Sequence, residues 1–188
     1  MLADDINDAY INKAGPIKQA QIDWLLSRGV PSAALGDDPD GLGFALAAGE
    51  VVFDAAGAVF DFASERPDER AIPAVVFVAR DECGLADDLV AWSARYDRLA
   101  SWLGRASMLG AQNALSSRVG DPALDVHPSP LAWLAAQRRG VCIIDPDRAR
   151  ITLECAQPLR AASVRHGIAL RTAMTRPSPR ILISRKAA

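Results

Sequence analysis

Two consecutive β-hairpin patterns in the middle of the chain constrain its fold more than any other feature of the sequence. Each pattern consists of two β-prone segments around a turn that contains glycine. The segments are residues 51–54 and 59–62 in the first hairpin and residues 74–80 and 88–92 in the second. Because consecutive strands joined by short turns pair with each other, two hairpins in series predict an antiparallel β meander.

Helical patterns flank this meander. Residues 16–28 carry apolar side chains at helical spacing, begin with a proline suited to a first helical turn, and are followed by Gly29. Residues 129–138 open with Ser-Pro, a cap residue before a proline, and predict a second helix. Residues 159–174 predict a third helix. The chain therefore combines an N-terminal helix and a β meander with a helix-rich C-terminal half.

The helix predicted for residues 159–174 is apolar on two sides. Leu170 and Met174 lie on one side, and Val164 and Ile168 lie on the other. We therefore expect this helix to be packed between two layers, with its arginines at the layer edges.

Two short apolar segments in the last third indicate strands. Residues 141–144 are typical of a buried strand, and residues 181–183 predict a final strand. With a helix between them they would form a strand-helix-strand unit, right-handed if the strands are parallel. Hydrophobic periodicity does not decide the secondary structure of two segments. Residues 99–103 form a strand or begin a helix, and residues 147–155 form a helix or a strand.

These elements predict an α+β fold, with a mixed α/β class as the alternative. A chain of 188 residues, 50% hydrophobic and 23% charged, is not intrinsically disordered, and its length predicts a single domain over residues 1–188. The apolar runs are too short for a membrane helix, and the acidic N-terminal segment does not resemble a signal peptide. We expect a cytoplasmic protein with no membrane partner.

Charge is divided unequally along the chain. Residues 1–90 contain 17 acidic and 6 basic side chains, whereas residues 91–188 contain 6 acidic and 15 basic ones. Most of the basic residues are arginine, whose planar guanidinium binds phosphate or carboxylate with two hydrogen bonds. The basic half therefore predicts a contact surface for nucleic acid or for an acidic protein surface, with pairing of the two halves inside the fold as the alternative. The six arginines that we expect to form this surface are Arg160, Arg165, Arg171, Arg176, Arg180 and Arg185.

The segment Val141–Ala149 is the sharpest candidate for chemistry. It is an apolar strand followed by Asp145 and Asp147, and carboxylates at the end of a strand suit Mg²⁺. This arrangement resembles the Asp-x-Asp motif of the Toprim domain of topoisomerases and primases. Residues 24–30, Trp-Leu-Leu-Ser-Arg-Gly-Val, are also similar to a helix-end sequence of bacterial primases. The resemblance implies that Asp145 and Asp147 bind a metal ion.

The chain departs from the Toprim pattern in two places. Arg150 stands where a small residue or glycine is expected, and a catalytic glutamate should close an earlier strand before a glycine. Glu82 is the residue that could take this role, but it lies in the predicted turn of the second hairpin. Without a metal, Asp145 would cap a helix or open a turn at Pro146, and Asp147 would favour the positive N-terminal end of that helix.

Other chemistries have weaker signals in this sequence. The three cysteines and two histidines match no zinc spacing, and Cys142, inside an apolar run, is expected to be a buried thiol. The tryptophans lie in apolar patterns and are expected in the core, with stacking on bases as the alternative. They are Trp24, Trp92, Trp102 and Trp133.

We therefore expect a non-enzymatic bacterial or phage-type protein that binds a macromolecule through its Arg-rich C-terminal third and needs no cofactor. The first alternative is a Mg²⁺-dependent nucleic-acid enzyme of the Toprim type. The second is a self-assembling component, a homo-oligomer in which the acidic and basic halves of neighbouring copies pair.

Overall fold

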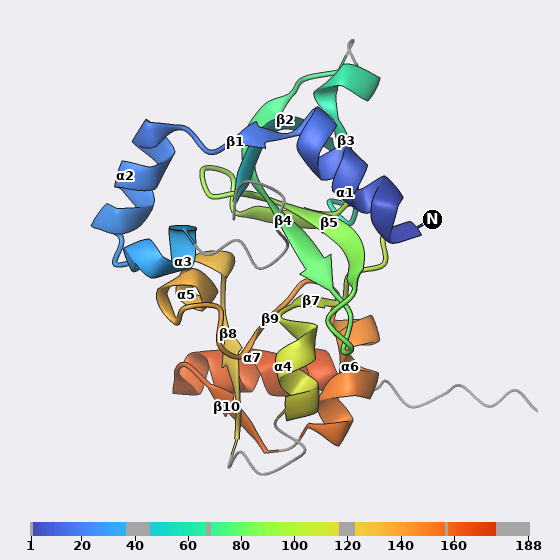
Figure 1. Cartoon of the computed structure of the whole chain (residues 1–188). Coiled ribbons are helices and arrows are strands. Elements are labelled where there is room, and N and C mark those ends of the chain that lie inside the picture. Colours follow the sequence, from blue (N-terminus) through green and yellow to red (C-terminus); the bar gives the residue numbers. More distant parts are fainter. Residues whose placement is uncertain (1, 37–45, 67–68, 117–122, 157, 176–188) are drawn as a thin grey trace, which may run out of the picture.

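A computed structural model describes residues 2–36, 46–66, 69–116, 123–156 and 158–175 (Figure 1). Within these residues the chain forms helices and two β-sheets, which confirms the α+β class. The helices are α1 (Leu2–Lys13), α2 (Gln19–Ser27), α3 (Ser32–Gly36), the 3₁₀ helix η1 (Ala63–Glu65), α4 (Ala111–Ser116), α5 (Pro130–Ala135), α6 (Pro146–Cys155) and α7 (Val164–Met174). The strands are β1 (Gly15–Pro16), β2 (Ala47–Phe53), β3 (Phe60–Phe62), β4 (Ile72–Arg80), β5 (Ala86–Ser93), β6 (Arg98–Ser101), β7 (Met108–Leu109), β8 (Leu124–His127), β9 (Val141–Ile143) and β10 (Leu159–Ala161).

The first sheet contains both predicted hairpins. Its strands are ordered β1-β2-β4-β5-β6, and β3 pairs with β2 on the edge that β1 also uses. The hairpins β2–β3 and β4–β5 are antiparallel, as predicted. They do not follow one another as a meander, because β4 pairs with β2 and not with β3. A parallel bridge between Val59 and Ser101 joins the segment before β3 to the edge strand β6. The sheet therefore curls until its two edges meet.

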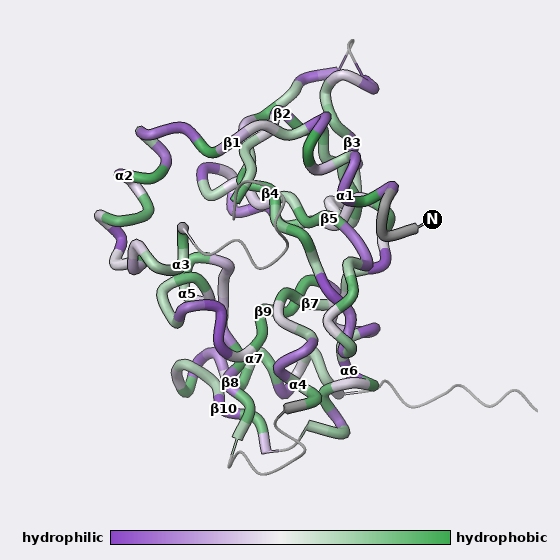
Figure 2. Tube along the Cα trace, in the orientation of Figure 1, coloured by the Kyte–Doolittle hydropathy of each residue, from purple (hydrophilic) through white to green (hydrophobic). Residues whose placement is uncertain are grey.

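Strands β4 and β5 are buried on both faces, which explains their almost continuous apolar sequence (Figure 2). Ala74 and Val76 point into a first core, and Val75 and Phe77 point into a second core on the opposite face. Helix α1, which was not among the predicted helices, lies across the first face (Figure 1). The α1 residues buried there are Ile6, Ala9 and Tyr10.

The second core contains side chains from both sheets. Phe77 of β4 meets Trp133 of α5 edge-on, with ring centroids 6.1 Å apart, and Leu109 of β7 and Cys142 of β9 belong to the same cluster. Burial raises the pKa of Cys142 to about 12, so its thiol stays neutral and packs as a small apolar group, as predicted. The face of β4 and β5 opposite α1 is thus covered by α2, α3, α5 and the second sheet (Figure 1).

The second sheet is mixed. Its strands are ordered β10-β8-β9-β7, with β8, β9 and β10 parallel and β7 antiparallel to β9. Helix α5 connects β8 to β9, and α6 connects β9 to β10. A third core fills the space between this sheet and α4, α6 and α7. The buried strand predicted for residues 141–144 is β9, which confirms that prediction.

The starts that the sequence predicts for two helices, at Pro16 and at Leu159, are wrong. Pro16 belongs to β1, and α2 begins only at Gln19. Leu159 begins β10, which pairs with β8, and α7 starts after Ser163, whose side chain accepts a hydrogen bond from His166 N at 3.1 Å. In both cases a short strand pairs with a distant segment, and this tertiary contact overrides the local helical pattern.

The prediction that α7 is packed between two layers is also wrong. Leu170 and Met174 pack against the third core, but the side of the helix with Val164 and Ile168 faces solvent, and these residues are 84% and 65% exposed. The strand predicted for residues 181–183 lies outside the described residues. None of the helices in the described part of the chain is long and apolar enough to cross a membrane.

The structure shows the secondary structure of the two segments for which the sequence allowed a strand or a helix. Residues 98–101 form strand β6, which pairs with β5, and residues 146–155 form helix α6. The predicted helix from Ser129 is present as α5 but is shorter than expected. It ends at Ala135, because Gln137 and Arg138 adopt left-handed backbone angles (φ 57° and 60°).

A buried carboxylate holds the segment that leads from the first sheet to the second. The side chain of Asp88 is fully buried, and its Oδ1 accepts hydrogen bonds from the backbone N–H groups of Leu89 and Leu103, at 2.8 and 2.9 Å. Its Oδ2 accepts from the N–H groups of Arg105 and Ala106, at 2.8 and 3.1 Å. The carboxylate thus satisfies backbone donors that would otherwise lack a partner.

Candidate functional site

Helix α2 forms one wall of the candidate site. Its first turn is closed by Gln21, whose Oε1 accepts a hydrogen bond from the Lys18 N–H at 3.0 Å. It ends before Gly29, whose φ of +86° reverses the chain. Leu25 is fully buried against the first sheet and fixes the orientation of the helix, so that its neighbour Trp24 faces the cavity described below.

Strands β4 and β5 form the opposite wall. Val75 and Trp92 are register partners on the face that α2 covers. The hydroxyl of Ser93 donates a hydrogen bond to the carbonyl oxygen of Pro73 at 3.0 Å, which ties the two strands together at this end. Because β5 ends at Ser93, the turn that follows carries Arg95 to the rim of the cavity.

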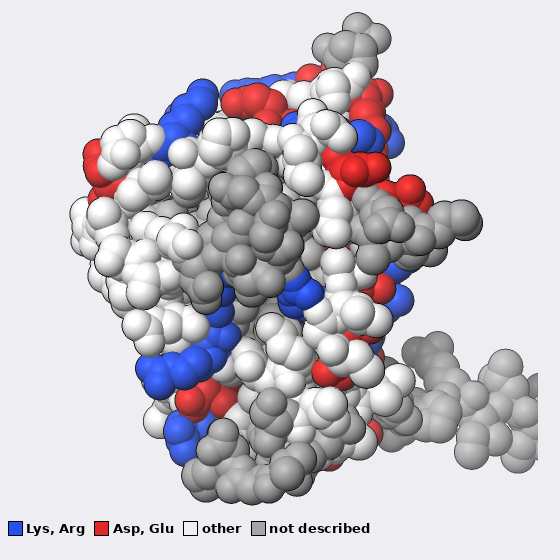
Figure 3. Space-filling model, in the orientation of Figure 1, with Lys and Arg blue, Asp and Glu red and all other residues white. Residues whose placement is uncertain are grey.

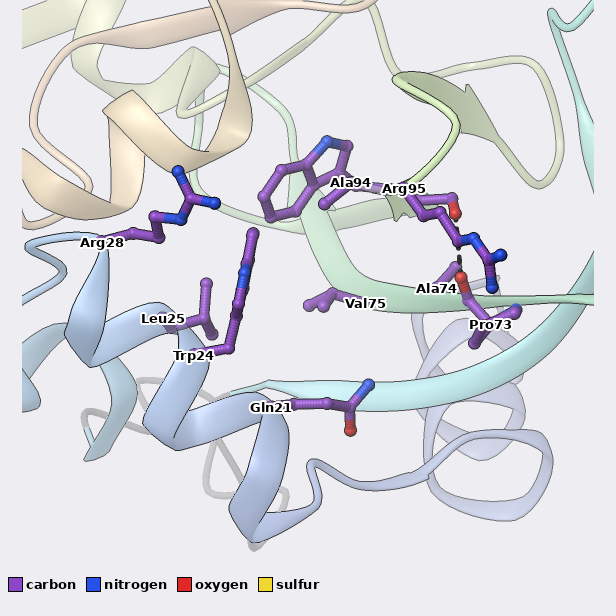
Figure 4. A pocket seen from close by; sticks show the side chains of 11 residues that line it. Gln21, Trp24, Leu25, Arg28, Pro73, Ala74, Val75, Ala94 and Arg95 are labelled. Carbon is purple, nitrogen blue, oxygen red and sulfur yellow. Dashed lines mark hydrogen bonds between the residues drawn. The ribbon is translucent and has the colours of Figure 1, made fainter.

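Between these walls lies a cavity of about 400 Å³ (Figure 4). This volume falls in the range of small-molecule sites, about 300–1,000 Å³. Among the described residues that line it, two are tryptophan, two are arginine and none is acidic. Figure 4 shows Arg28 and Arg95 on opposite sides of the cavity, with Trp24 and Val75 between them.

The two tryptophans give the cavity an aromatic wall. The ring centroids of Trp24 and Trp92 are 6.1 Å apart, at an interplanar angle of 46°. Trp92 is buried, whereas Trp24 is partly exposed. The guanidinium carbon of Arg28 lies 5.6 Å from the centroid of the Trp24 ring, a cation–π contact. A planar ligand therefore meets one accessible indole whose orientation is held by its neighbours.

The two arginines of the cavity give it a positive charge. Both Arg28 and Arg95 are exposed, and among the residues that the structure describes neither forms an ion pair with a carboxylate. Arg66 contrasts with them, because it pairs with Asp61 and Glu69 at 2.8 Å each. Because no acid of the described chain pairs with them or lines the cavity, the two guanidinium groups favour the binding of anions here.

The structure places Asp145 and Asp147 at the start of α6. The Asp145 side chain accepts hydrogen bonds from the backbone N–H groups of Asp147 and Arg148, at 2.9 and 3.2 Å, which confirms the helix-cap hypothesis. The exposed side chain of Asp147 pairs with Arg150. Among the described residues, no group of three or more His, Cys, Asp or Glu side chains is arranged to hold a metal ion. The magnesium site stays a prediction.

The Toprim resemblance expects a catalytic glutamate that closes an earlier strand before a glycine. Strand β9 lies between β8, which ends at His127, and β7, which ends at the fully buried Leu109. Because β7 runs antiparallel to β9, Leu109 lies away from the end of β9 where Asp145 follows. Neither neighbouring strand ends in a glutamate. The candidate that the sequence offers, Glu82, lies outside both strands and accepts a hydrogen bond from the hydroxyl of Thr152 in α6 at 2.5 Å.

The described arginines of the C-terminal third do not converge. Nη1 of Arg160 on β10 lies 3.2 Å from Oδ1 of Asp125, an ion pair within the second sheet. Arg165 and Arg171 are exposed on α7, where a separation of six residues places them about 120° apart around the helix axis. Figure 3 shows the positive side chains of one face in separate groups with acids among them. The remaining predicted residues, Arg176, Arg180 and Arg185, lie outside the described part of the chain.

The residues of the candidate site that the sequence patterns missed are those that tertiary structure brings together. Of the four tryptophans, Trp102 packs against Phe62 in the first core, with ring centroids 6.0 Å apart, and Trp133 packs in the second core. Only Trp24 and Trp92 share a cavity. The spacing of Trp24 and Arg28, one helical turn, was a local signal for this pair, but nothing in the sequence connects either residue with Arg95.

The hairpin β4–β5 gives a pH-dependent prediction through Asp87. Burial, and then the charge of Asp88, raise the pKa of Asp87 above its ordinary value of 3.8, although Arg105 and Arg148 oppose this shift. The folded state therefore disfavours the ionised form, and Asp87→Asn is expected to stabilise the protein at pH 7. This gain should shrink as the pH falls through the raised pKa, because Asp87 then protonates. Urea unfolding across this pH range checks the prediction, with Asp8→Asn on α1 as the exposed control, and destabilisation by Asp87→Asn at pH 7 would contradict it.

Comparisons of the chain with family models, with curated proteins and with solved structures found no match. The resemblance to the Toprim domain therefore stays a prediction. What the site can do follows from the geometry of its own residues: an aromatic wall, two exposed arginines and a cavity of about 400 Å³.

Proposed function

We propose that this protein binds single-stranded nucleic acid, with a base in the Trp24–Trp92 cavity and the flanking phosphates near Arg28 and Arg95. The observation that carries the proposal is the combination, in one cavity, of an accessible indole ring with two arginines and, among the described lining residues, no carboxylate. Every base has a π face that stacks on aromatic side chains, and arginine binds phosphate through its planar fork.

A single strand fits this cavity better than a duplex. The aromatic wall lies between a helix and a sheet, so a base reaches it only when it is unstacked and turned away from other bases. Bases of single strands are available in this way, whereas those of a duplex are stacked and paired. The proposal retains the predicted nucleic-acid partner and moves the contact surface from the C-terminal arginines to the face between α2 and the first sheet.

Substitution of Trp24 tests the proposal. Trp24→Ala is expected to lower the affinity for a fluorescently labelled oligothymidylate about 10- to 100-fold, because base–aromatic stacking contributes about 1–3 kcal/mol per base. Trp24→Phe retains an aromatic face and should preserve most of the affinity. Fluorescence anisotropy at low and at physiological salt measures both variants.

The matched control is Leu26→Ala, which alters the same helix at an exposed position outside the cavity. We expect this variant to bind like the wild type. Equal affinities of the wild type and Trp24→Ala would remove the proposed function, provided that circular dichroism shows both variants folded.

A further inference from the structure

We infer that the site takes an oligonucleotide rather than a mononucleotide, with the neighbouring nucleotide in a second cavity beside Lys18. This inference rests on the proposed function and names the ligand class of the same site. It follows from the way in which two cavities adjoin along α2, and from the charges that line the second one.

The second cavity adjoins the first. It measures about 650 Å³ and lies between the end of α1, β1 and β2, and it shares two lining residues with the first cavity, Gln21 and Pro73. Because Gln21 and Pro73 line both cavities, a linear ligand that passes over these two residues reaches both cavities. A strand with its base against Trp24 therefore has a path for its next nucleotide.

Lys18 is the cation that this path reaches. Its side chain is exposed and lines the second cavity, and the hydrogen bond from its backbone N–H to Gln21 Oε1 holds it next to the junction of the two cavities. Lys18 and Trp24 are six residues apart, about 9 Å along a helix axis, within reach of adjacent nucleotides of an extended strand.

The other charged residues of the second cavity limit how strongly this cavity binds phosphate. Lys13 is held by Glu65, with Nζ 2.5 Å from Oε1, and lies 4.7 Å from the centroid of the Trp102 ring. Glu50 is the acidic residue in the lining, and it repels phosphate. Lys18 is therefore expected to contribute a single phosphate contact, which an oligonucleotide makes and a mononucleotide in the first cavity does not.

The experiment compares thymidine 5′-phosphate with oligothymidylates of increasing length as ligands of Lys18→Gln. We expect the affinity for the oligonucleotides to fall about 3- to 10-fold at low salt, with the affinity for the mononucleotide unchanged. The slope of log affinity against log salt should become shallower by about 0.7, the value for one phosphate contact on a single strand. Arg70→Gln removes an exposed positive charge outside both cavities and is the control.

The outcomes separate this inference from the proposed function. Suppose that Trp24→Ala lowers the affinity for every ligand, but that Lys18→Gln lowers none of the affinities or lowers those for the mononucleotide and the oligonucleotides equally. The two-cavity path is then wrong, and the proposed function stands. If Trp24→Ala changes nothing, the proposed function itself fails. Competition by polyglutamate as strong as that by oligothymidylate would identify an acidic peptide as the ligand and overturn the inference.

Discussion

Asp88→Asn is expected to lower the free energy of unfolding by about 2 to 6 kcal/mol. Asparagine has nearly the same shape, but its amide nitrogen cannot accept the hydrogen bonds that one carboxylate oxygen takes from Arg105 N and Ala106 N. Each of these backbone donors would face another donor in a fully buried position, and an unsatisfied buried donor costs about 1–3 kcal/mol. Urea unfolding followed by circular dichroism measures the loss.

Asp81→Asn is the matched control for this prediction. In the turn between β4 and β5, one oxygen of Asp81, Oδ1, accepts both hydrogen bonds, from Cys83 N and Leu85 N at 2.9 Å each. The carbonyl oxygen of an asparagine can take both, so we expect a change within about 0.5 kcal/mol. A similarly small change for Asp88→Asn would show that the segment from Leu103 to Ala106 does not depend on the carboxylate.

Gly140→Ala is expected to destabilise the protein by about 3 to 5 kcal/mol. Gly140 has a φ of +74°, and a Cβ atom there would lie 2.3 Å from the carbonyl oxygen of Asp125. The backbone must move to relieve this overlap. The movement would disturb the hydrogen bonds that the Gly140 carbonyl oxygen accepts from the side chains of Asn113 and Trp133, at 2.8 and 3.1 Å. Thermal and urea unfolding measure the loss.

Gly29→Ala isolates the contribution of the backbone angle. Gly29 also has a positive φ, +86°, but a Cβ atom there would meet open space. We expect a loss of about 1 kcal/mol, the cost of a left-handed conformation for alanine. If both variants lost the same amount, the close approach between Gly140 and Asp125 would carry no energetic weight.

Local patterns predicted the parts of the fold that local interactions determine. The hairpins β2–β3 and β4–β5 followed from β-prone segments around turns, and the start of α5 followed from Ser129, whose hydroxyl accepts a hydrogen bond from Ala132 N at 3.3 Å. The boundary between β10 and α7 was missed, because Leu159 has helical spacing to later apolar residues but pairs with Leu124 of β8. The sequence pattern of a short segment does not indicate which distant segment it pairs with.

The same distinction explains what could be predicted of the site. The cap by Asp145 was predictable, because all its hydrogen bonds are made within three residues of the chain. The cavity was not, because Trp24 and Trp92 meet only after β4 and β5 pair and Leu25 docks α2 on them. Arg95 lies in an irregular turn, where no periodic pattern indicates the direction of its side chain.

The contiguous arrangement of the two sheets along the chain has a consequence for synthesis. All strands of the first sheet end by Ser101, so this sheet can form while later residues are still on the ribosome. The face with Val75 and Phe77, however, is covered in part by Trp133, which emerges later. A nascent chain from which Ser101 has emerged but Trp133 has not therefore presents a nearly complete sheet with part of one apolar face uncovered, a surface suited to chaperones or to aggregation with other nascent chains.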